Sequence, residues 1–243
     1  MIQKRSSSGL FWAVFGLASG AAIAWLATRP RSMPNLYATQ RALAKLHGEV
    51  RAGFLAGRIQ EKYDQLMAHR PRFSHPALRW HLEGNILPGL ATYQVLCDEL
   101  GDRAAAQSET GHILAANFVP GRKPLWQMLG LLPQPFRLMR PALRWIMRFE
   151  FPVEGWETQW VEDNEQRIGM DISRCFYLDV LTTLGAPELT GTFCALDDYD
   201  ARQMPPGILF ERSGTLGRGQ THCDFRYCTP AGRSIDFMNE KQL

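Results

Sequence analysis

The sequence predicts an α+β protein: an N-terminal transmembrane helix, a helical subregion, and a C-terminal antiparallel sheet with inserted helices. Three observations support this fold class. Residues 9–28 contain no charged side chain, apolar residues then recur at steps of three and four, and beyond residue 155 they alternate at step two. The chain has 243 residues, of which 45% are hydrophobic. This is enough for a packed domain behind a membrane segment.

These patterns divide the chain into an anchor and a body. We assign residues 1–34 to a membrane anchor and linker, and residues 35–243 to one domain. Within that domain we expect a helical part over 35–152 and a sheet part over 153–243. The division follows the change from helical to strand periodicity.

The segment Gly9–Thr28 is long enough to cross a bilayer. As a helix rising ~1.5 Å per residue it spans roughly 30 Å, and Trp12 and Trp25 stand near its two ends, as interfacial aromatic residues do. We therefore predict a single-pass protein of a bacterial-type inner membrane that contacts lipid through residues 9–28. A cleaved signal peptide is the alternative. The cysteine content favours a cytoplasmic body.

The first part of the body reads as helices. Apolar residues spaced by three and four from Leu43 to Leu66 predict one amphipathic helix that ends before Pro71. Ser74 is the expected N-cap of a second helical stretch, which Pro88 should break. A third stretch should end at Gly101, and a fourth, capped by Asp102, should reach about Phe118.

A basic apolar stretch follows between Pro124 and Pro152. Its arginines are spaced to share one helical face, and Pro141 should kink or restart the helix; they are Arg137, Arg140, Arg144 and Arg148. A solvated face over ordinary core packing is the favoured interpretation. The alternative is a basic stripe that lies on anionic lipid, opposite Leu138, Leu143, Trp145 and Ile146.

The last third of the chain predicts strands. Alternation over residues 156–160 and 168–172 indicates a hairpin around the turn 163–165. Helices are expected over 177–185 and 193–203, followed by strands over 208–212 and 222–227. On the final strand, alternation places Cys223, Phe225 and Tyr227 on one face and His222, Asp224 and Arg226 on the other.

Charge and cysteine usage narrow the function classes. The net charge is only +3, and the basic residues are dispersed, so we expect no nucleic-acid partner. The five cysteines are an odd number without a C-x-x-C pair, which favours reduced thiols over a disulfide scaffold. Five histidines match no metal motif and are expected to face solvent or cap helices: His47, His69, His75, His81 and His112.

Several motifs, in order, resemble the L-2-amino-thiazoline-4-carboxylic acid hydrolase family over roughly residues 80–230. They are Asn85-Ile-Leu-Pro-Gly with Tyr93, Phe151-Pro152 through Trp156, Cys-Phe-Tyr-Leu-Asp (175–179), Gly-Ala-Pro-Glu-Leu (185–189), Phe-Cys-Ala-Leu-Asp-Asp (193–198), Phe-Glu-Arg-Ser-Gly-Thr-Leu-Gly-Arg-Gly (210–219) and Cys-Asp-Phe-Arg-Tyr (223–227). The resemblance implies a small-molecule substrate, a cyclic isothiourea that bears a carboxylate.

Hydrolysis of such a ring needs three groups. A carboxylate should hold the cationic N–C–N unit, an arginine should bind the substrate carboxylate, and a nucleophile or base must attack the ring carbon. Asp224 or Asp197 is the candidate for the carboxylate, and Arg226 or Arg212 for the arginine. Cys175 or Cys223 is the candidate nucleophile, and water activated by an aspartate is the alternative to a thiolate. Cys175, at a strand-to-helix junction, is preferred over Cys223.

The sequence therefore predicts a membrane-anchored hydrolase. It would open an L-2-amino-thiazoline-4-carboxylate-like ring to an N-carbamoyl-cysteine-like product. The catalytic candidates are Cys175, Cys223 and Asp224, and the substrate-binding candidates are Arg226, Asp197 and Arg212. The alternative is a membrane-anchored small-molecule-binding or sensory module without turnover. No cofactor is expected; a metal held by Cys175, Cys194 and Cys223 with His222 or an aspartate is the competing hypothesis, and the oligomeric state is left open.

Overall fold

The computed structural model describes residues 32–233, apart from the side chain of Val119. The predicted span at residues 9–28 lies outside this range, so the anchor and the domain boundary stay predictions. Among the described helices, none combines the length and apolar character needed to cross a membrane. The core already includes Met33, which is buried and whose backbone N–H donates to Gln60 Oε1 at 2.7 Å.

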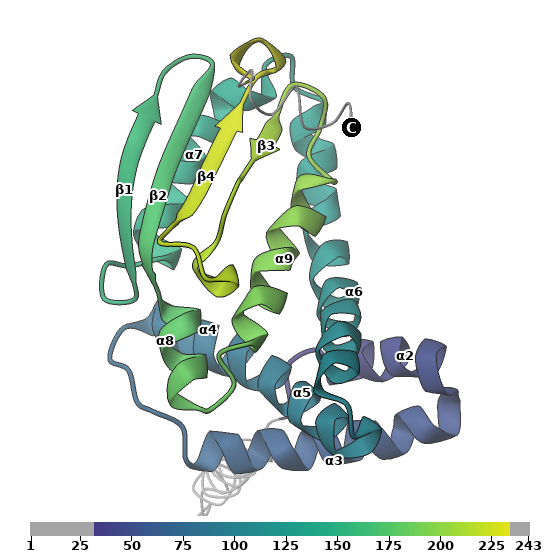
Figure 1. Cartoon of the computed structure of the whole chain (residues 1–243). Helices are drawn as coiled ribbons and strands as arrows, with labels where there is room; N and C mark the ends of the chain where they lie inside the picture. The colour runs from purple at the N-terminus through teal and green to yellow at the C-terminus, as the bar shows by residue number, and fades with distance from the viewer. Residues whose placement is uncertain (1–31, 234–243) are drawn as a thin grey trace, which may run out of the picture. The chain divides into compact units, whose positions relative to one another are not determined.

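Two helices replace the single helix predicted from Leu43 to Leu66. They are α2 (Leu36–His47) and α3 (Glu49–Ala68), and they are separated by Gly48. Gly48 has φ +81°, a left-handed conformation that glycine adopts without a steric penalty. The chain therefore turns at Gly48, and α3 folds back against α2 (Figure 1). The spacing of apolar residues continues across the turn, which is why periodicity alone did not show it.

A widened helical turn joins the next two helices. Helix α4 (Pro76–His81) passes through a π-helical turn, η1 (Leu82–Ile86), directly into α5 (Leu87–Leu100). The N-cap of α4 is His75, whose Nδ1 accepts from the N–H of Ala77 at 3.2 Å, so the prediction of Ser74 as N-cap was wrong. Pro88 lies in the first turn of α5 and does not interrupt it, which corrects the predicted break.

Pro88 and the π-helical turn fit together chemically. In an i→i+5 pattern the carbonyl of Glu83 would accept from residue 88, but proline has no N–H to donate. The hydroxyl of Tyr63 on α3 donates to this carbonyl instead, at 3.0 Å. The backbone group left over by the proline is thus satisfied by a neighbouring helix.

Helix α6 (Arg103–Gly130) is longer than predicted. The predicted cap is confirmed, since the carboxylate of Asp102 accepts from the N–H groups of Ala104 and Ala105. The helix does not stop near Phe118 but continues through Pro120 and Pro124, which are both exposed. Beyond them, packing holds the helix: the Trp126 indole N–H donates to Asp200 on α9 (Leu189–Ala201) at 2.7 Å. This tertiary contact overrides the helix-breaking tendency of the prolines.

The sheet has four antiparallel strands in the order β1-β2-β4-β3 (Figure 1). These are β1 (Trp156–Asp163), β2 (Arg167–Cys175), β3 (Leu209–Glu211) and β4 (Cys223–Cys228). The predicted hairpin is confirmed as β1 and β2, and its turn is held by Asn164, whose side chain accepts from the N–H groups of Gln166 and Arg167. Strand β4 pairs with both β2 and β3.

Helix α7 (Pro135–Glu150) lies behind the sheet in Figure 1 and runs through Pro141 as one helix, so the helix does not restart there. Two of its arginines dock it against β1. Arg140 and Arg144 both bind the carboxylate of Asp163, and the Arg144 guanidinium stacks on the Trp160 ring at 4.5 Å. The four arginines are therefore not one uniform solvated face.

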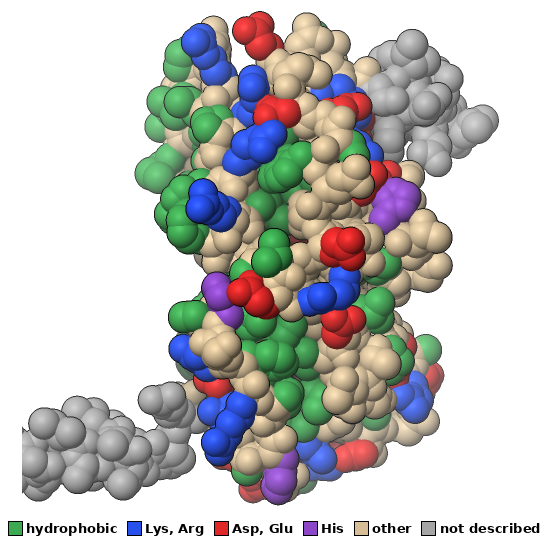
Figure 2. Space-filling view, turned by 90° about the vertical axis from the view of Figure 1, so that its left-hand side faces the viewer, with side chains coloured by type: hydrophobic (Ala, Val, Ile, Leu, Met, Phe, Trp, Pro, Cys, Tyr) green, Lys and Arg blue, Asp and Glu red, His purple; other side chains and the backbone are tan. Residues whose placement is uncertain are grey.

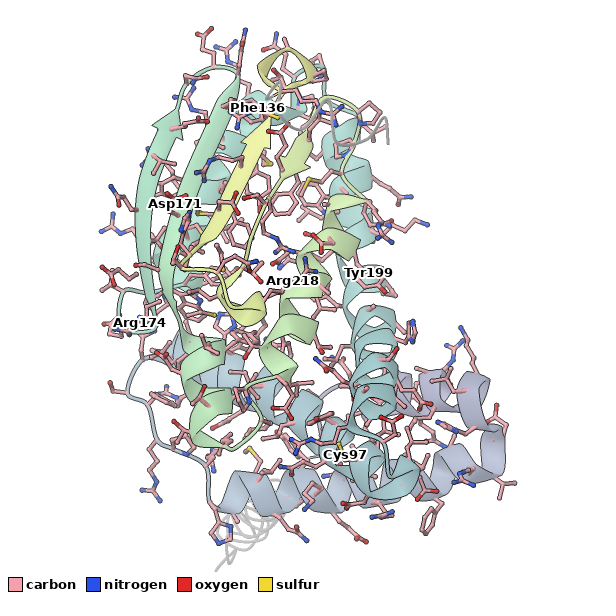
Figure 3. The ribbon with its side chains drawn as sticks, viewed as in Figure 1. Cys97, Phe136, Asp171, Arg174, Tyr199 and Arg218 are labelled. Atoms are coloured by element: carbon pink, nitrogen blue, oxygen red, sulfur yellow. The ribbon has the colours of Figure 1, made fainter. Side chains whose placement is uncertain are left out.

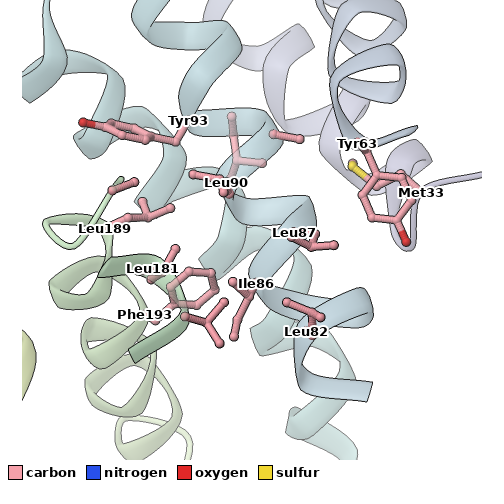
Figure 4. Close-up of a cluster of buried hydrophobic side chains, with 14 of the residues drawn as sticks. Met33, Tyr63, Leu82, Ile86, Leu87, Leu90, Tyr93, Leu181, Leu189 and Phe193 are labelled. Carbon is pink, nitrogen blue, oxygen red and sulfur yellow. The ribbon is translucent and has the colours of Figure 1, made fainter. Parts of the chain in front are cut away.

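Two further helices connect the sheet to the helical part: α8 (Phe176–Thr183) and α9. Figure 4 shows the junction, where buried side chains of η1 and α5 face those of α8 and α9. The labelled members of this contact are Leu82, Ile86, Leu87, Leu90, Leu181, Leu189 and Phe193. At Gly89 a Cβ would lie 2.6 Å from the Phe193 ring, so the close approach needs glycine. Two short 3-10 turns complete the described chain, η2 (Leu216–Arg218) and η3 (Pro230–Gly232).

Candidate active site

The predicted site residues fall on two faces of the sheet. Strand β4 alternates as predicted: Cys223, Phe225 and Tyr227 lie opposite the inward-facing residues of β2. Those partners are Ile172, Met170 and Ile168. Asp224 and Arg226 lie on the outer face, so they do not join the inward-facing candidates in one site.

Arg226 is held by side-chain and backbone contacts on the outer face. It binds Asp171 Oδ1 at 2.7 Å and donates to the carbonyls of Met170 at 2.9 Å and Phe225 at 3.1 Å (Figure 3 labels Asp171). Gly169 makes room for it, since a Cβ there would lie 2.5 Å from Arg226 Cδ. The geometry therefore gives Arg226 the role of joining β2 to β4.

Asp224 holds the turn that follows β3. Its carboxylate accepts from the backbone N–H groups of Ser213 and Gly214 and from the Ser213 hydroxyl at 2.6 Å. Partial burial raises the pKa of this carboxyl, but these hydrogen bonds more than offset it and keep the pKa below the ordinary value. Asp224 thus resembles a structural cap more than a general base.

Arg212 occupies the inner face. Its guanidinium binds Asp197 Oδ2 and Asp198 Oδ1, both at 2.8 Å, and the carbonyl of Cys194 at 3.0 Å. The rings of Phe210 and Phe225 lie 5.5 and 5.4 Å from it, and only 3% of its side chain is exposed. Because both Nη atoms bind these partners and aromatic rings lie beside the guanidinium, Arg212 is placed to hold the two aspartates.

Asp197 is the carboxylate with a functionally suitable pKa. Burial of the carboxyl group raises the pKa of Asp197 to about 6, although 42% of its side chain is exposed. The ion pair with Arg212 opposes this effect, and the neighbouring carboxylates of Asp198 and Asp200 reinforce it. Among the described residues Arg212 is the hydrogen-bond partner of Asp197, and it binds one oxygen. Asp197 therefore combines a raised pKa with an accessible carboxylate, as a general base requires.

A second arginine lies at the other end of this ion-pair network. Arg218 on η2 is 53% exposed and approaches Asp198 Oδ2 at 3.5 Å, which is too long for a strong hydrogen bond. Figure 3 shows Arg218 beside α9, the helix that carries both aspartates. The network Asp197, Arg212, Asp198 and Arg218 thus begins at an accessible carboxylate and ends at an accessible guanidinium.

Three cysteines surround the same region. Cys223 is buried and accepts from the N–H of Leu216 at 3.2 Å, while Cys194 Sγ lies 2.9 Å from the position of a Cβ at Gly217. Burial raises the pKa of Cys175 to about 12 and of Cys223 to about 11, and it also raises that of Cys194. Nearby N–H groups at the start of α8 offset only part of this effect for Cys175. These thiols are protonated at neutral pH, so none is an activated nucleophile in this state.

The metal hypothesis finds no support in the described residues. Within residues 32–233, no three or more histidine, cysteine, aspartate or glutamate side chains converge as metal ligands would. His222 instead lies beside the hydroxyl of Thr221, at 3.0 Å. The cysteines are therefore neighbours without the geometry of a zinc site.

His81 is buried, although the sequence suggested a solvent-facing or capping residue. Its Nε2–H donates to the carbonyl of Glu150 at 2.9 Å, and Nδ1 accepts from the Tyr177 hydroxyl at 3.0 Å. The rings of Phe151 and Trp156 lie about it at 5.1 and 4.9 Å. Burial lowers the pKa of His81 to about 4, despite the opposing hydrogen bond to Glu150, so the ring is neutral at pH 7.

Tyr177 extends this polar chain toward the cysteines. The side chain of Asn85, in the π-helical turn, interacts with the same hydroxyl. Charge on Cys175 or Asp197 would raise the pKa of this hydroxyl further. Burial raises the pKa of Tyr177 well above its ordinary value, so the phenol remains a hydrogen-bond donor. Three polar side chains thus meet at the Tyr177 hydroxyl, next to Cys175. We call them the polar wall: Asn85, His81 and Tyr177.

Tyr177, Asn85 and Arg218 lie within the motifs that resemble the family, but their pattern alone predicted no role for them. Arg218 lies between two glycines, and Tyr177 follows Cys175 by two residues. The signal that could have indicated a functional role for either residue was therefore its position within a motif. His81 gave none, because its burial comes from aromatic residues on distant elements. Two surface cavities, of about 520 and 280 Å³, lie elsewhere and include none of the network residues.

Comparisons with known proteins agree with the recognised motifs. The sequence profile described as L-2-amino-thiazoline-4-carboxylic acid hydrolase matches residues 79–227, which contain the ion-pair network, the three cysteines and the polar wall. No curated protein matches the chain. One solved structure, an Fe(II) unliganded H-NOX protein mutant from K. algicida, is 11% identical and aligns over 84% of this chain and 100% of its own. Its TM-score of 0.33 does not establish a shared fold.

Proposed function

Because the chain belongs to the L-2-amino-thiazoline-4-carboxylic acid hydrolase family, we propose that it hydrolyses a cyclic amidine of the thiazoline type that carries a carboxylate. The observation that carries this proposal is the network from Asp197 to Arg218. It offers a carboxylate of raised pKa and an accessible guanidinium on the same part of the molecule. A substrate that is cationic at its N–C–N unit and anionic at its carboxylate matches both groups.

In the proposed reaction, water attacks the amidine carbon of the ring. Asp197 takes one proton from the water while the water oxygen forms a bond to the amidine carbon. The carbon–sulfur bond of the resulting tetrahedral species then breaks, and the sulfur leaves with the bond electrons. Protonation of this thiolate gives a thiol, so that substrate and one water become an N-carbamoyl-cysteine-like product. A pKa of about 6 leaves Asp197 mainly ionised at pH 7, yet basic enough to accept the proton.

The two arginines have different roles in this proposal. Arg218, which is more than half exposed, binds the substrate carboxylate through its unpaired donors. Arg212, which is almost fully buried, is a positioning residue that holds Asp197 and Asp198. This assignment differs from the predicted use of Arg226 and Arg212 as carboxylate ligands, because both of these arginines already bind an aspartate within the protein.

In this proposal the cysteines lie beside the polar wall and do not react with the substrate. A thiolate mechanism at Cys175 would first require a proton to leave a thiol with a pKa of about 12. Asp197 needs no such step, which is why water activation is favoured over covalent catalysis. We further propose that residues 9–28 anchor the enzyme in a bilayer, on the basis of their length, charge-free composition and flanking basic residues.

The experiment is a turnover assay on the full chain in detergent micelles with L-2-amino-thiazoline-4-carboxylate. Release of thiol is followed over time, and the product is identified by mass. Asp197→Asn is expected to lower kcat by roughly 10²- to 10⁴-fold, the range for loss of a general base. Asp179→Asn, which changes an exposed acid on α8 outside the network, is the matched control and should retain activity.

The same assay separates the hydrolase from a binding module. Saturable binding of the thiazoline without release of thiol would support a module that keeps the site but lacks turnover, and would overturn the proposal. Equal turnover in Asp197→Asn and the parent would retain the activity but remove Asp197 as its base.

A further inference from the structure

The outer face of α7 is unusually apolar for a surface that solvent can reach. Leu138, Trp145 and Phe149 are 50%, 61% and 51% exposed, and their spacing of seven and four residues aligns them in one stripe. Four more large apolar side chains are exposed in the segment that leads into α7, at the end of α6 and in the turn after it: Leu125, Met128, Leu131 and Leu132. We refer to these seven exposed side chains together as the apolar patch.

Basic side chains are exposed in the same segments as the apolar patch. Arg137 and Arg148 are exposed on α7, and Lys123 is exposed on α6, before Leu125. Helix α7 carries four arginines and one acidic residue, Glu150, in its last turn. Within residues 32–233, Arg137 and Arg148 have no acidic partner, whereas Arg140 and Arg144 bind Asp163. Figure 2 shows green and blue side chains together at the upper left edge, the side on which α7 lies behind the sheet.

We propose that this face of α7 binds the surface of a bilayer that contains anionic lipid. A helix with an apolar stripe, bordering arginines and an aromatic residue on the stripe is the type that lies in the membrane interface. Phe136, Met139 and Met147 are buried on its inner side, toward the sheet, whereas within residues 32–233 its outer side is exposed. The anionic headgroups complement Arg137, Arg148 and Lys123.

The position of the predicted span favours lipid over other occupants. Four residues, 29–32, separate the end of the predicted span from Met33, the first buried core residue that the structure describes. Even fully extended, residues 29–32 reach only about 14 Å, at roughly 3.5 Å per residue. A domain attached through so short a linker stays close to the bilayer, where both hydrophobic insertion and charge attraction act. This inference does not depend on the proposed hydrolase activity.

The experiment compares the full chain in two kinds of nanodisc by hydrogen–deuterium exchange. One contains phosphatidylcholine alone, and the other contains about 30% phosphatidylserine, which supplies the anionic surface. Peptides that cover residues 134–150 are expected to exchange several-fold more slowly in the anionic discs. Peptides from α3 and from β2, which lie away from the apolar patch, should exchange equally in both and report that the fold is intact.

Two paired charge reversals sharpen the comparison. Arg137→Glu with Arg148→Glu is expected to abolish the difference between the discs at residues 134–150. The matched control, Arg72→Glu with Arg202→Glu, makes the same charge change at exposed positions outside α6 and α7 and should retain the difference. Trp145→Gln should weaken the protection while leaving the charge unchanged.

Two outcomes would overturn the proposal. Equal exchange over residues 134–150 in both discs would show that anionic lipid does not bind this face. Protection that is independent of lipid but grows with protein concentration would instead assign the face to contact with a second copy of the chain.

Discussion

Tyr177, in the first turn of α8, donates its hydroxyl hydrogen to Nδ1 of His81, the last residue of α4, at a distance of 3.0 Å. The two residues are 96 positions apart. Because Nε2 of the same ring donates to the carbonyl of Glu150, the tautomer of His81 is set from both sides. One imidazole thus joins the helical part, the end of α7 and the sheet-to-helix junction beside Cys175.

This arrangement predicts a pH dependence of stability. The pKa of His81 is about 4 in the folded chain and near 6.5 when the chain unfolds. The unfolded state therefore binds an extra proton between these values, so stability is complete above pH 6.5 and is lost as pH falls toward 4. The shift corresponds to a loss of about 3 kcal/mol in the free energy of unfolding. Urea unfolding at several pH values measures it.

A non-titrating side chain isolates the contribution of His81. In His81→Gln the slope of the unfolding free energy between pH 6.5 and 4 should be shallower than in the parent. His112→Gln, at an exposed position, serves as the control and should keep the parental slope. Parallel slopes in all three proteins would show that His81 does not control acid stability.

The raised pKa of Asp197 predicts the acidic limb of the rate profile. If Asp197 is the base, kcat should fall about tenfold per pH unit below an apparent pKa near 6. Arg212→Lys keeps a positive charge but loses the planar fork, so it should move the limb to higher pH. Steady-state rates from pH 4.5 to 8.5 test this, and a profile that stays flat below pH 6 would contradict the assignment.

The buried thiols predict slow alkylation. With pKa values of about 12 and 11, Cys175 and Cys223 hold very little thiolate at pH 7.5 and should react with iodoacetamide far more slowly than in the urea-unfolded chain. Cys175→Ser should retain turnover within about tenfold of the parent, below the usual loss of a catalytic group. Fast alkylation of Cys175 together with loss of turnover would restore the thiolate mechanism.

The packing of Arg226 over Gly169 predicts a contrast between two glycines. Gly169→Ala would place a methyl group 2.5 Å from Arg226 Cδ and should destabilise the fold by about 1–3 kcal/mol, as overpacking does. Gly57→Ala, inside α3 with no neighbour within 4 Å, should instead stabilise it by about 0.4–1 kcal/mol. Chemical unfolding of both variants compares them, and equal effects would rule out the close contact at Gly169.

The strands and their faces were predictable because alternation at step two has no helical counterpart. It correctly placed Cys223 and Phe225 opposite Asp224 and Arg226. Helix ends were less predictable, since local signals competed with packing. Pro120 and Pro124 normally end a helix, but α6 continues through them and is held beyond them by the contact of Trp126 with Asp200.

The site was harder to predict than the fold. Sequence alone suggested two arginines as carboxylate ligands, yet both are paired with aspartates through contacts that form only in the folded chain. Arg212 meets Asp197 and Asp198 only when β3 and α9 are packed, and Arg226 meets Asp171 only across the β2–β4 pair. The burial of His81 likewise depends on Phe151 and Trp156, which approach it only in the folded chain.

The π-helical turn at Leu82–Ile86 puts the two halves of one long helical segment out of phase. A π-helical turn contains one more residue than an α-helical turn. It therefore changes the direction in which the side chains of α5 point relative to those of α4. Removal of one residue from this turn would restore a regular helix and rotate α5 by about 100° relative to α4. Leu87 and Leu90 would then leave the core, or His81 and Asn85 would leave Tyr177. The length of this turn is therefore as constrained as its side chains, and insertions or deletions should be less tolerated here than in the exposed turns.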